Sequence, residues 1–282
     1  MNGGLVRLRE IIHTITPSER KVASFILEQP QRLVGMSVAQ LAEQSGGSQA
    51  AVIRLCKSAG FKGYQELMLK VAGDLQEQSQ SQSGYQEINP DDSIERIIEN
   101  VSANNIQSIR DTVKILNPAS IEQAVQALLD AKRIFFFGIG ASNLIATDAQ
   151  HKFLRINKTC FAFADADLQL ISSVMLTPDD TVVGISYSGK TPVTVECMKI
   201  AREAGARTIS ITRYGNTPVG NLADIPLHIS STENEIRSGA TSSRITQLNV
   251  IDILYLAVAS RDYEQSVTYL EKSRNIVRKS KR

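Results

Sequence analysis

The second half of the chain alternates apolar runs of strand character with amphipathic runs, and this alternation limits the folds available to it. Five short runs rich in β-branched and aromatic residues begin with RIFFF at residue 133 and end with IPLHI at residue 225. Runs of helical period follow the first three of them and the last. Strands that alternate with helices form a parallel sheet with helices on both faces. We therefore expect a doubly wound α/β domain.

Residues 1–75 have a different pattern, which is helical throughout. Thr16, followed by Pro17 and by Glu19, is typical of a helix start. Pro30 is expected to end that helix, because proline cannot continue one. The sequence predicts an all-α bundle of five helices here.

Residues 76–92, QEQSQSQSGYQEINPDD, separate these two patterns. The segment is rich in Gln and Ser and poor in apolar residues, so it cannot bury a core and is typical of a linker. We expect a helical domain over 1–75, a linker over 76–92, and the α/β domain with a helical lead-in over 93–282.

The stretch MSVAQLAEQSGGSQAAVIRLCKSAGF, residues 36–61, has the spacing of a helix-turn-helix. Val52, Ile53 and Leu55 are expected to anchor its second helix. A glutamine pairs with an adenine edge and an arginine with guanine, so the outward side chains of that helix suit DNA. A helical hairpin that packs only for stability is the alternative. The candidate DNA-binding residues are Ser48, Gln49, Ala50, Arg54 and Lys57.

The charge is uneven along the chain. Residues 1–75 contain nine Lys and Arg against six Asp and Glu, and residues 271–282 contain six against one, whereas the middle contains 16 against 22. Basic ends are compatible with a nucleic-acid partner. A solvated surface is the alternative interpretation.

Two glycine-containing loops at predicted strand ends carry groups that bind anions. GIGAS, residues 138–142, follows the first strand, and SYSGKT, residues 186–191, follows the third. Ligands of open parallel sheets bind at the carboxyl ends of the strands, and helix N-termini attract phosphate. A turn whose Ser and Thr only cap the helix is the alternative. The candidate ligand residues here are Gly140, Ser142, Ser186, Ser188, Gly189 and Thr191.

GISYSGKT, residues 184–191, also matches the P-loop pattern G-x-x-x-x-G-K-T. A P-loop NTPase needs a Mg²⁺-binding Asp after another apolar strand, and this chain offers no strong candidate. Gly184 is also expected inside a strand rather than in the turn. We interpret the match as accidental, with an NTPase as a remaining alternative.

These motifs together resemble a known family. The G-x-G-x-S and S-x-S-G-x-T loops resemble the sugar isomerase (SIS) domain, and TPSERKVASFIL with SQAAVIRLCKSAGFKGYQEL is similar to the DNA-binding part of the RpiR/MurR regulators. The segment EIRSGATSSRITQLNVIDILY, residues 235–255, is typical of their last part. The resemblance covers nearly the whole chain and departs from the usual pattern at Lys190 and at Pro192 and Val193.

The resemblance implies a transcription regulator that is not an enzyme, needs no cofactor, and binds a palindromic operator in double-stranded DNA as a homodimer or higher oligomer. Its effector would be a phosphosugar, with an N-acetylated hexosamine phosphate as the first choice. The implied phosphosugar contacts fall on Ser142, Ser186, Ser188 and Thr191, and Arg237, Ser238 and Ser242 are weaker suggestions. From its place in the segment ENEIRSG, Glu235 is a further candidate, either as the carboxylate base of an isomerase or as a group that bonds sugar hydroxyls.

A phosphosugar isomerase with an accessory helical domain is the alternative, since isomerisation needs a base near the sugar. His13, His151 and His228 all lie away from the two loops in sequence. With three scattered cysteines they form no metal-ligand pattern, so no metal site is expected. No apolar run approaches the length of a membrane span. We expect a cytoplasmic protein with no membrane partner.

Overall fold

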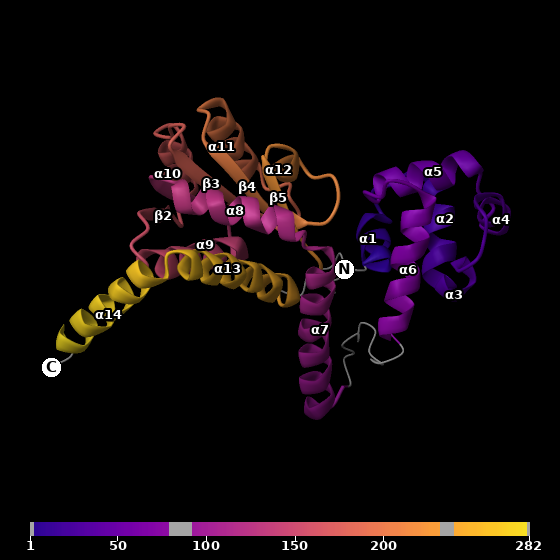
Figure 1. The fold of residues 1–282 in the computed structure, drawn as a ribbon, viewed down its shortest axis with the longest axis horizontal. Helices are drawn as coiled ribbons and strands as arrows, with labels where there is room; N and C mark the ends of the chain where they lie inside the picture. The colour runs from indigo at the N-terminus through magenta and orange to yellow at the C-terminus, as the bar shows by residue number, and fades with distance from the viewer. Residues whose placement is uncertain (1–2, 79–91, 232–239, 281–282) are drawn as a thin grey trace. The chain divides into compact units, whose positions relative to one another are not determined.

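The computed structural model describes residues 3–78, 92–231 and 240–280. The chain divides into two compact units, one that contains helices α1 to α7 and one that contains helices α8 to α14 with a five-stranded sheet (Figure 1). None of the helices in these described ranges is long and apolar enough to cross a membrane.

The first unit is all-α, as predicted. Thr16 caps α2 through a capping box with Glu19, which explains why the helix begins at Pro17. Val22, Ile26 and Leu55 are fully buried in the core of the unit. The helices of this unit are α1 (Gly4–Ile11), α2 (Pro17–Glu28), α3 (Pro30–Leu33), α4 (Val38–Gln44), α5 (Gln49–Ser58), α6 (Tyr64–Gln78) and α7 (Ile94–Ile115).

Helix α2 ends at Glu28, before Pro30, as predicted, but the sequence prediction missed one short helix of this unit and misplaced one side chain. Pro30 opens the additional short helix α3, because proline suits a first helical position. Ile53 was expected to anchor α5, yet it is 41% exposed, whereas Val52, Leu55 and Cys56 are buried. The buried face of α5 is made of two adjacent pairs one turn apart, Ala51 with Val52 and Leu55 with Cys56, and Ile53 lies outside this face.

The boundary between the domains stays a prediction. Helix α6 continues to Gln78, so it extends into the predicted linker, and residues 79–91 lie outside the described residues. Helix α7 groups with the first unit, whereas the sequence analysis assigned residues from 93 onward to the second domain.

The second unit contains the predicted parallel sheet. Every strand pair is parallel, and the strand order is β2-β1-β3-β4-β5. The central pair is aligned so that Phe137 at the end of β1 lies beside Gly184 near the end of β3. The strands are β1 (Arg133–Phe137), β2 (Cys160–Ala162), β3 (Asp180–Ile185), β4 (Arg207–Arg213) and β5 (Ile225–Ile229).

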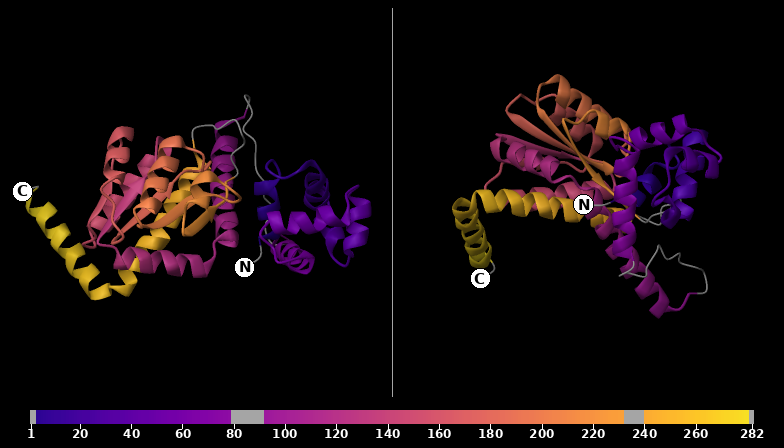
Figure 2. Two further views of the ribbon diagram at one scale, coloured as in Figure 1. Left: turned by 90° about the horizontal axis from the view of Figure 1, so that it is seen from above. Right: turned by 45° about the vertical axis from the view of Figure 1, so that its right-hand side comes forward.

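Helices cover both faces of the sheet, which confirms the doubly wound prediction (Figures 1 and 2). Phe136 packs in one core with α8 (Pro118–Asp130), α9 (Ala141–Leu154) and α13 (Ser242–Arg261). Phe135 and Phe137 pack in the other core, with α10 (Ala166–Ser173), α11 (Pro192–Glu203) and α12 (Pro218–Asn221). Helix α14 (Tyr263–Ser280) follows α13, and neither α12 nor α14 was predicted.

The strand order locates the ligand crevice of such a sheet. From β1 the chain moves outward to β2, and from β3 it moves the other way, to β4 and β5. The connections therefore diverge between β1 and β3. In sheets of this order the crevice at that switch point, at the carboxyl ends of the strands, is the usual ligand site.

Candidate functional site

The two loops predicted to hold an anion follow β1 and β3, so they meet at the switch point. Gly138 and Ile185 lie so close that a Cβ atom added at Gly138 would come within 3.1 Å of the Ile185 carbonyl oxygen. A side chain at position 138 would thus separate the loops. The glycine allows both backbones to approach the same small volume.

Gly140 forms the start of α9 with φ +61° and ψ −125°, a conformation that is essentially restricted to glycine. Ser142 lies half-buried in the first turn of α9. The loop before it is held by Gln169, which sequence reasoning missed. The buried amide of Gln169 accepts from the Gly138 N–H at 3.1 Å and donates to the Gly138 carbonyl at 2.9 Å. Gln169 has no motif of its own, so only its packing reveals this role.

The second turn, residues 186–191, is held by its own hydroxyls. The Ser186 hydroxyl, which is 1% exposed, lies 2.9 Å from the Thr191 hydroxyl and accepts from the Gly189 N–H at 3.1 Å. The half-buried Ser188 hydroxyl accepts from the Lys190 N–H at 3.2 Å. Lys190 itself is exposed.

Gly189 has φ +64°, which favours glycine, and a Cβ atom there would collide with the Thr217 side chain. Thr217 is another residue that sequence reasoning missed. It caps the short helix α12 and lies against the turn after β3. The shape of the turn thus depends on a residue about thirty positions further along the chain.

Helices α9 and α11 begin without a side-chain cap within the described chain, at Gly140 and Thr191. By contrast, Asp165 caps α10 and Thr217 caps α12. In α9 the Ser142 and Asn143 N–H groups donate to the Ile139 and Gly140 carbonyls, and α11 begins at Pro192, which has no N–H. No side chain competes with an anion at either helix N-terminus. The partial positive charge of a helix N-terminus attracts phosphate.

The remaining predicted ligand residues belong to the segment before α13. Ser242 is the first residue of α13 and is buried. Glu235, Arg237 and Ser238 lie outside the described residues.

The alternatives to a sugar-phosphate site find little support in the fold. Gly184 lies inside β3, paired with Ser210, so the glycine that a P-loop needs in its turn is in a strand here. His151 is exposed in the third turn of α9, and His228 lies in β5 against the Tyr214 ring. Neither histidine is in the turns at the switch point.

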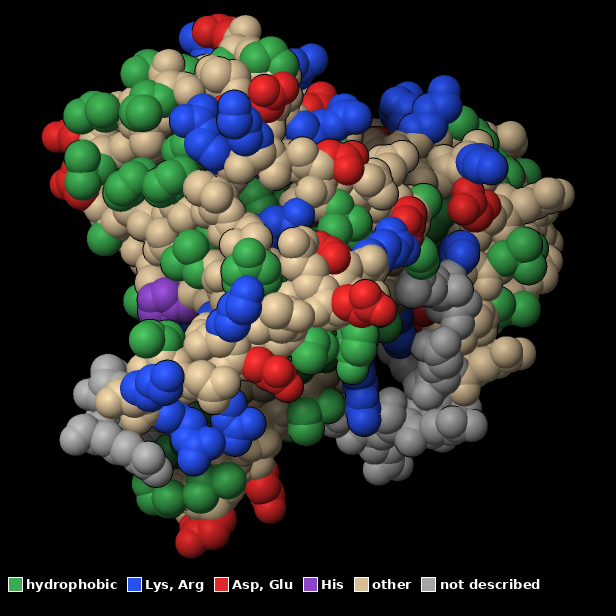
Figure 3. Space-filling model, turned by 60° about the vertical axis from the view of Figure 1, so that its left-hand side comes forward, with side chains coloured by type: hydrophobic (Ala, Val, Ile, Leu, Met, Phe, Trp, Pro, Cys, Tyr) green, Lys and Arg blue, Asp and Glu red, His purple; other side chains and the backbone are tan. Residues whose placement is uncertain are grey.

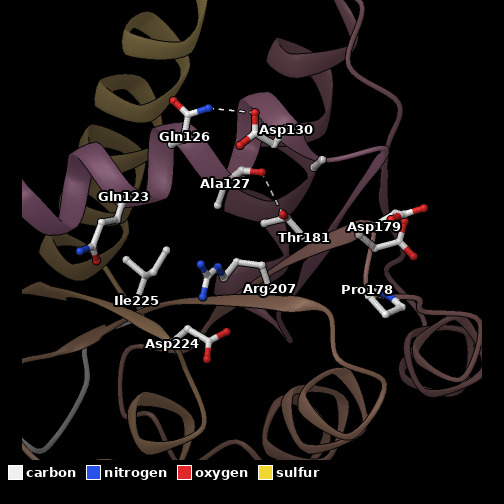
Figure 4. A pocket seen from close by; sticks show the side chains of 12 residues that line it. Gln123, Gln126, Ala127, Asp130, Pro178, Asp179, Thr181, Arg207, Asp224 and Ile225 are labelled. Atoms are coloured by element: carbon white, nitrogen blue, oxygen red, sulfur yellow. Dashed lines mark hydrogen bonds between the residues drawn. The ribbon is translucent and has the colours of Figure 1, made fainter.

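A cavity of about 530 Å³ lies at the opposite edge of the sheet, where the strands begin (Figure 4). Arg207, Asp224 and Ile225 at the starts of β4 and β5 line it together with residues of α8. This cavity is separate from the predicted site, because the switch-point turns follow the other ends of the strands.

The candidate DNA-binding residues lie on one accessible surface. Ser48 accepts from the Ala51 N–H as the N-cap of α5. Arg54 donates to the Ser18 hydroxyl at 3.2 Å, at the start of α2. All five of these residues are exposed: Ser48, Gln49, Ala50, Arg54 and Lys57.

Glu19 fixes α5 against α2 beneath this surface. Its carboxylate, which is almost fully buried, accepts from the Ser58 hydroxyl at 2.8 Å and from the Thr16 N–H at 3.0 Å. Burial alone would raise the pKa of Glu19, but these hydrogen bonds outweigh it and the pKa is lowered. A charged carboxylate thus holds the second helix of the motif in place.

Among the side chains coloured in Figure 3, acidic and basic groups are interspersed rather than gathered in one patch. The three cysteines are buried, and burial raises the pKa of Cys56 and Cys197 to about 11 and that of Cys160 to about 12. Their thiols are therefore protonated and unreactive at neutral pH.

Comparison with known proteins identifies the family. Residues 2–78 match the helix-turn-helix domain of the rpiR family, and residues 127–257 match the SIS domain. An uncharacterised HTH-type transcriptional regulator of Caldanaerobacter subterraneus is 43% identical over 98% of both chains. The chain belongs to the RpiR family of transcription regulators.

Similarity to other known proteins agrees with this result. HexR of Pseudomonas aeruginosa, an HTH-type transcriptional regulator, is 37% identical over 93% of this chain and 90% of its own. The structure of Vibrio vulnificus NanR, complexed with ManNAc-6P, matches 97% of both chains at 25% identity with a TM-score of 0.61. An RpiR transcription factor sugar isomerase domain from Sphaerobacter thermophilus has the same fold, with a TM-score of 0.59 over 64% of this chain and 98% of that domain.

Proposed function

We propose that this regulator changes its affinity for an operator when a sugar phosphate binds the turns at the β1/β3 switch point. One observation carries the proposal. Two helix N-termini without side-chain caps, at Gly140 and Thr191, follow the adjacent parallel strands β1 and β3. Because the same chain has a helix-turn-helix domain, an anion bound at these turns would act as an effector of DNA binding.

The phosphate would be held by backbone N–H groups and hydroxyls. The first turn of α9 would supply Ser142, and the turn after β3 would supply Ser188 and Thr191. Neutral N–H and hydroxyl donors at helix N-termini can bind a phosphate dianion although no Lys or Arg side chain takes part. Gly140 and Gly189 give the backbone the positive φ that these turns require.

The effector that we favour is an N-acetylated hexosamine 6-phosphate. NanR, which matches this chain over its whole length, was crystallised with ManNAc-6P. The segment with Glu235, Arg237, Ser238 and Ser242 would complete the site around the sugar.

The DNA-binding surface would be α5 in the major groove. The groove admits one helix, and Gln49 and Arg54 have the hydrogen-bonding groups that read base edges. Two copies in a homodimer would read the two halves of a palindrome. A sugar phosphate that binds one arrangement of the two copies better would shift the population toward it. Operators lie in the cytoplasm of a bacterial cell, where we place the protein.

The test starts from a random pool of DNA duplexes, from which the full-length protein selects those that it binds. The enriched sequence is then bound again with and without hexose and N-acetylhexosamine 6-phosphates. The proposal predicts an enriched palindrome whose affinity one sugar phosphate changes at least fivefold, within the usual range of allosteric coupling. Failure to enrich any sequence at low salt would contradict it, and turnover of a sugar phosphate would favour the isomerase instead.

A further inference from the structure

The buried face of α13 changes character along its length. Its buried residues near the start are polar, and those further along are apolar. The apolar ones, beginning with Val250 and Ile251, belong to the core against the sheet. The buried polar residues are Ser242, Ser243, Thr246 and Gln247.

Helices α9 and α13 run parallel and begin at the same level. Lys152, the twelfth residue of α9, forms an ion pair at 2.6 Å with Asp252, the eleventh residue of α13. Phe153 and Tyr255, one and three positions further, have ring centroids 6.0 Å apart. Helix α9 follows β1 and α13 follows β5 in the same all-parallel sheet, so both helices return from the carboxyl ends of the strands in the same direction. The polar turns of α13 therefore lie at the sheet edge where α9 begins, which is the edge of the switch-point turns.

Gln247 is the unusual member of this polar group. Its side chain is 2% exposed, and its Nε2 atom is buried with no hydrogen-bond partner among the residues that the structure describes. Thr246 differs, because its hydroxyl donates to the Ser243 carbonyl at 3.0 Å. A buried amide N–H that lacks a partner is unfavourable, so its presence calls for an explanation.

The direction of the Gln247 side chain explains why its amide has no described partner. Helical side chains lean toward the N-terminus of their helix. Gln247 is the sixth residue of α13, so its long side chain carries the amide back toward the first turn. Because α9 starts at the same level, the amide lies near the level of Ser142.

We propose that Gln247 is a sugar-recognising residue of the effector site. The turns after β1 and β3 hold the phosphate, and the Gln247 carboxamide hydrogen-bonds a hydroxyl or acyl oxygen of the sugar. A carboxamide supplies two donors and one acceptor, which suits the hydroxyl groups of a sugar. This inference rests on the proposed function, since it assigns the sugar-facing side of the same site.

The test is the variant Gln247→Met in the full-length protein. Methionine keeps the length and volume of glutamine but removes both hydrogen-bonding groups. The ligand is the sugar phosphate that wild type binds most tightly among the 6-phosphates of glucose, fructose, N-acetylglucosamine and N-acetylmannosamine. The affinity of the variant for this ligand falls about five- to tenfold, which corresponds to the loss of one hydrogen bond. Binding of inorganic phosphate does not change. The melting temperature of the ligand-free variant equals or exceeds that of wild type, because a buried group without a partner has gone.

Ser210→Ala is the matched control. The Ser210 hydroxyl is also buried without a described partner, but it lies in the middle of β4. This variant keeps wild-type affinity for every sugar phosphate. If wild type binds none of the sugar phosphates, the proposed function fails. If wild type binds one and Gln247→Met binds it equally well, or if Ser210→Ala weakens binding as much, the role of Gln247 is refuted while the proposed function stands.

Discussion

At the residue scale, the serines of the turn after β3 have different tasks although they stand two positions apart. The Ser186 hydroxyl is buried and bonds Thr191 and the Gly189 N–H, so it closes the turn. The Ser188 hydroxyl is half-buried and accepts only from the neighbouring Lys190 N–H among its described contacts. The first hydroxyl maintains the shape of the turn, and under the proposed function the second would exchange its partner for an anion.

Replacing each serine separately tests this division. Ser186→Ala removes the hydroxyl that bonds the Thr191 hydroxyl and the Gly189 N–H, and the Gly189 N–H keeps only its bond to the Ser186 carbonyl. The free energy of unfolding therefore falls by about 1 kcal/mol. Ser188→Ala changes it by less than about 0.5 kcal/mol. Both variants bind the sugar phosphate more weakly. Urea unfolding and titration calorimetry measure the two quantities, and equal stability of the two variants would refute the structural role of Ser186.

Asp180, at the start of β3, gives a pH-dependent term in stability. Its buried carboxylate accepts from Arg133 at 2.8 and 2.6 Å and from the Thr177 N–H at 2.8 Å. Burial would raise the pKa of Asp180, but the hydrogen bonds from Arg133 and Thr177 lower it overall. The carboxylate thus stabilises the fold above the unfolded pKa of about 4, and this contribution is lost as the pH falls through the lowered folded pKa.

Asp180→Asn should therefore reduce the free energy of unfolding by about 2 kcal/mol at pH 7. The difference from wild type should shrink as the pH falls below about 4, because wild type then loses the same charge. Urea unfolding at pH 7 and at acid pH measures both. Asp179→Asn, one position earlier and exposed, is the control and stays near wild type at either pH. A difference that persists in acid would exclude the ionic explanation.

At the element scale, one face of α5 is fixed by contacts to α2 and the opposite face is exposed to solvent. Glu19 bonds Ser58 at its end, and Ser18 takes a hydrogen bond from Arg54. Ile53, Lys57 and the start of the helix remain exposed. The motif thus separates residues that fix the helix from residues that are available to DNA.

Two variants on α5 should affect DNA binding differently. Lys57→Ala removes one contact to the phosphate backbone, so the slope of log affinity against log salt falls by about 0.9 for every sequence. Gln49→Ala instead relaxes the preference for one base pair, by about 1–3 kcal/mol, with the salt slope unchanged. Fluorescence anisotropy over a salt series measures both effects. Lys199→Ala, exposed on α11, is the control, and an equal loss in all three variants would show that α5 is not the reading helix.

Elements with strong local signals were predictable from the sequence, and elements set by distant contacts were not. The capping box at Thr16 and the apolar strands, from Arg133–Phe137 onward, are encoded within a few residues. Helix α3 is four residues long, which is too short to have a period. The roles of Gln169 and Thr217 depend on contacts to loops more than twenty-five positions away, so no pattern in the sequence indicates them.

At the scale of the whole molecule, the two domains of one chain combine DNA binding with sugar-phosphate sensing. The family relationship covers both the helix-turn-helix and the SIS domain. An effector can change operator affinity only by as much as its own affinity differs between the states that bind DNA well and poorly. Removing the anion site should therefore abolish the response without abolishing DNA binding.

The most direct measurement is the affinity of the full-length protein for its selected operator, with and without the sugar phosphate, in wild type and in a Ser142→Ala, Ser188→Ala double variant. The account predicts that the effector changes wild-type affinity at least fivefold. The double variant should bind the operator as tightly as ligand-free wild type and should not respond to the effector. A double variant that responds as wild type does would show that the effector acts elsewhere, and would contradict the account.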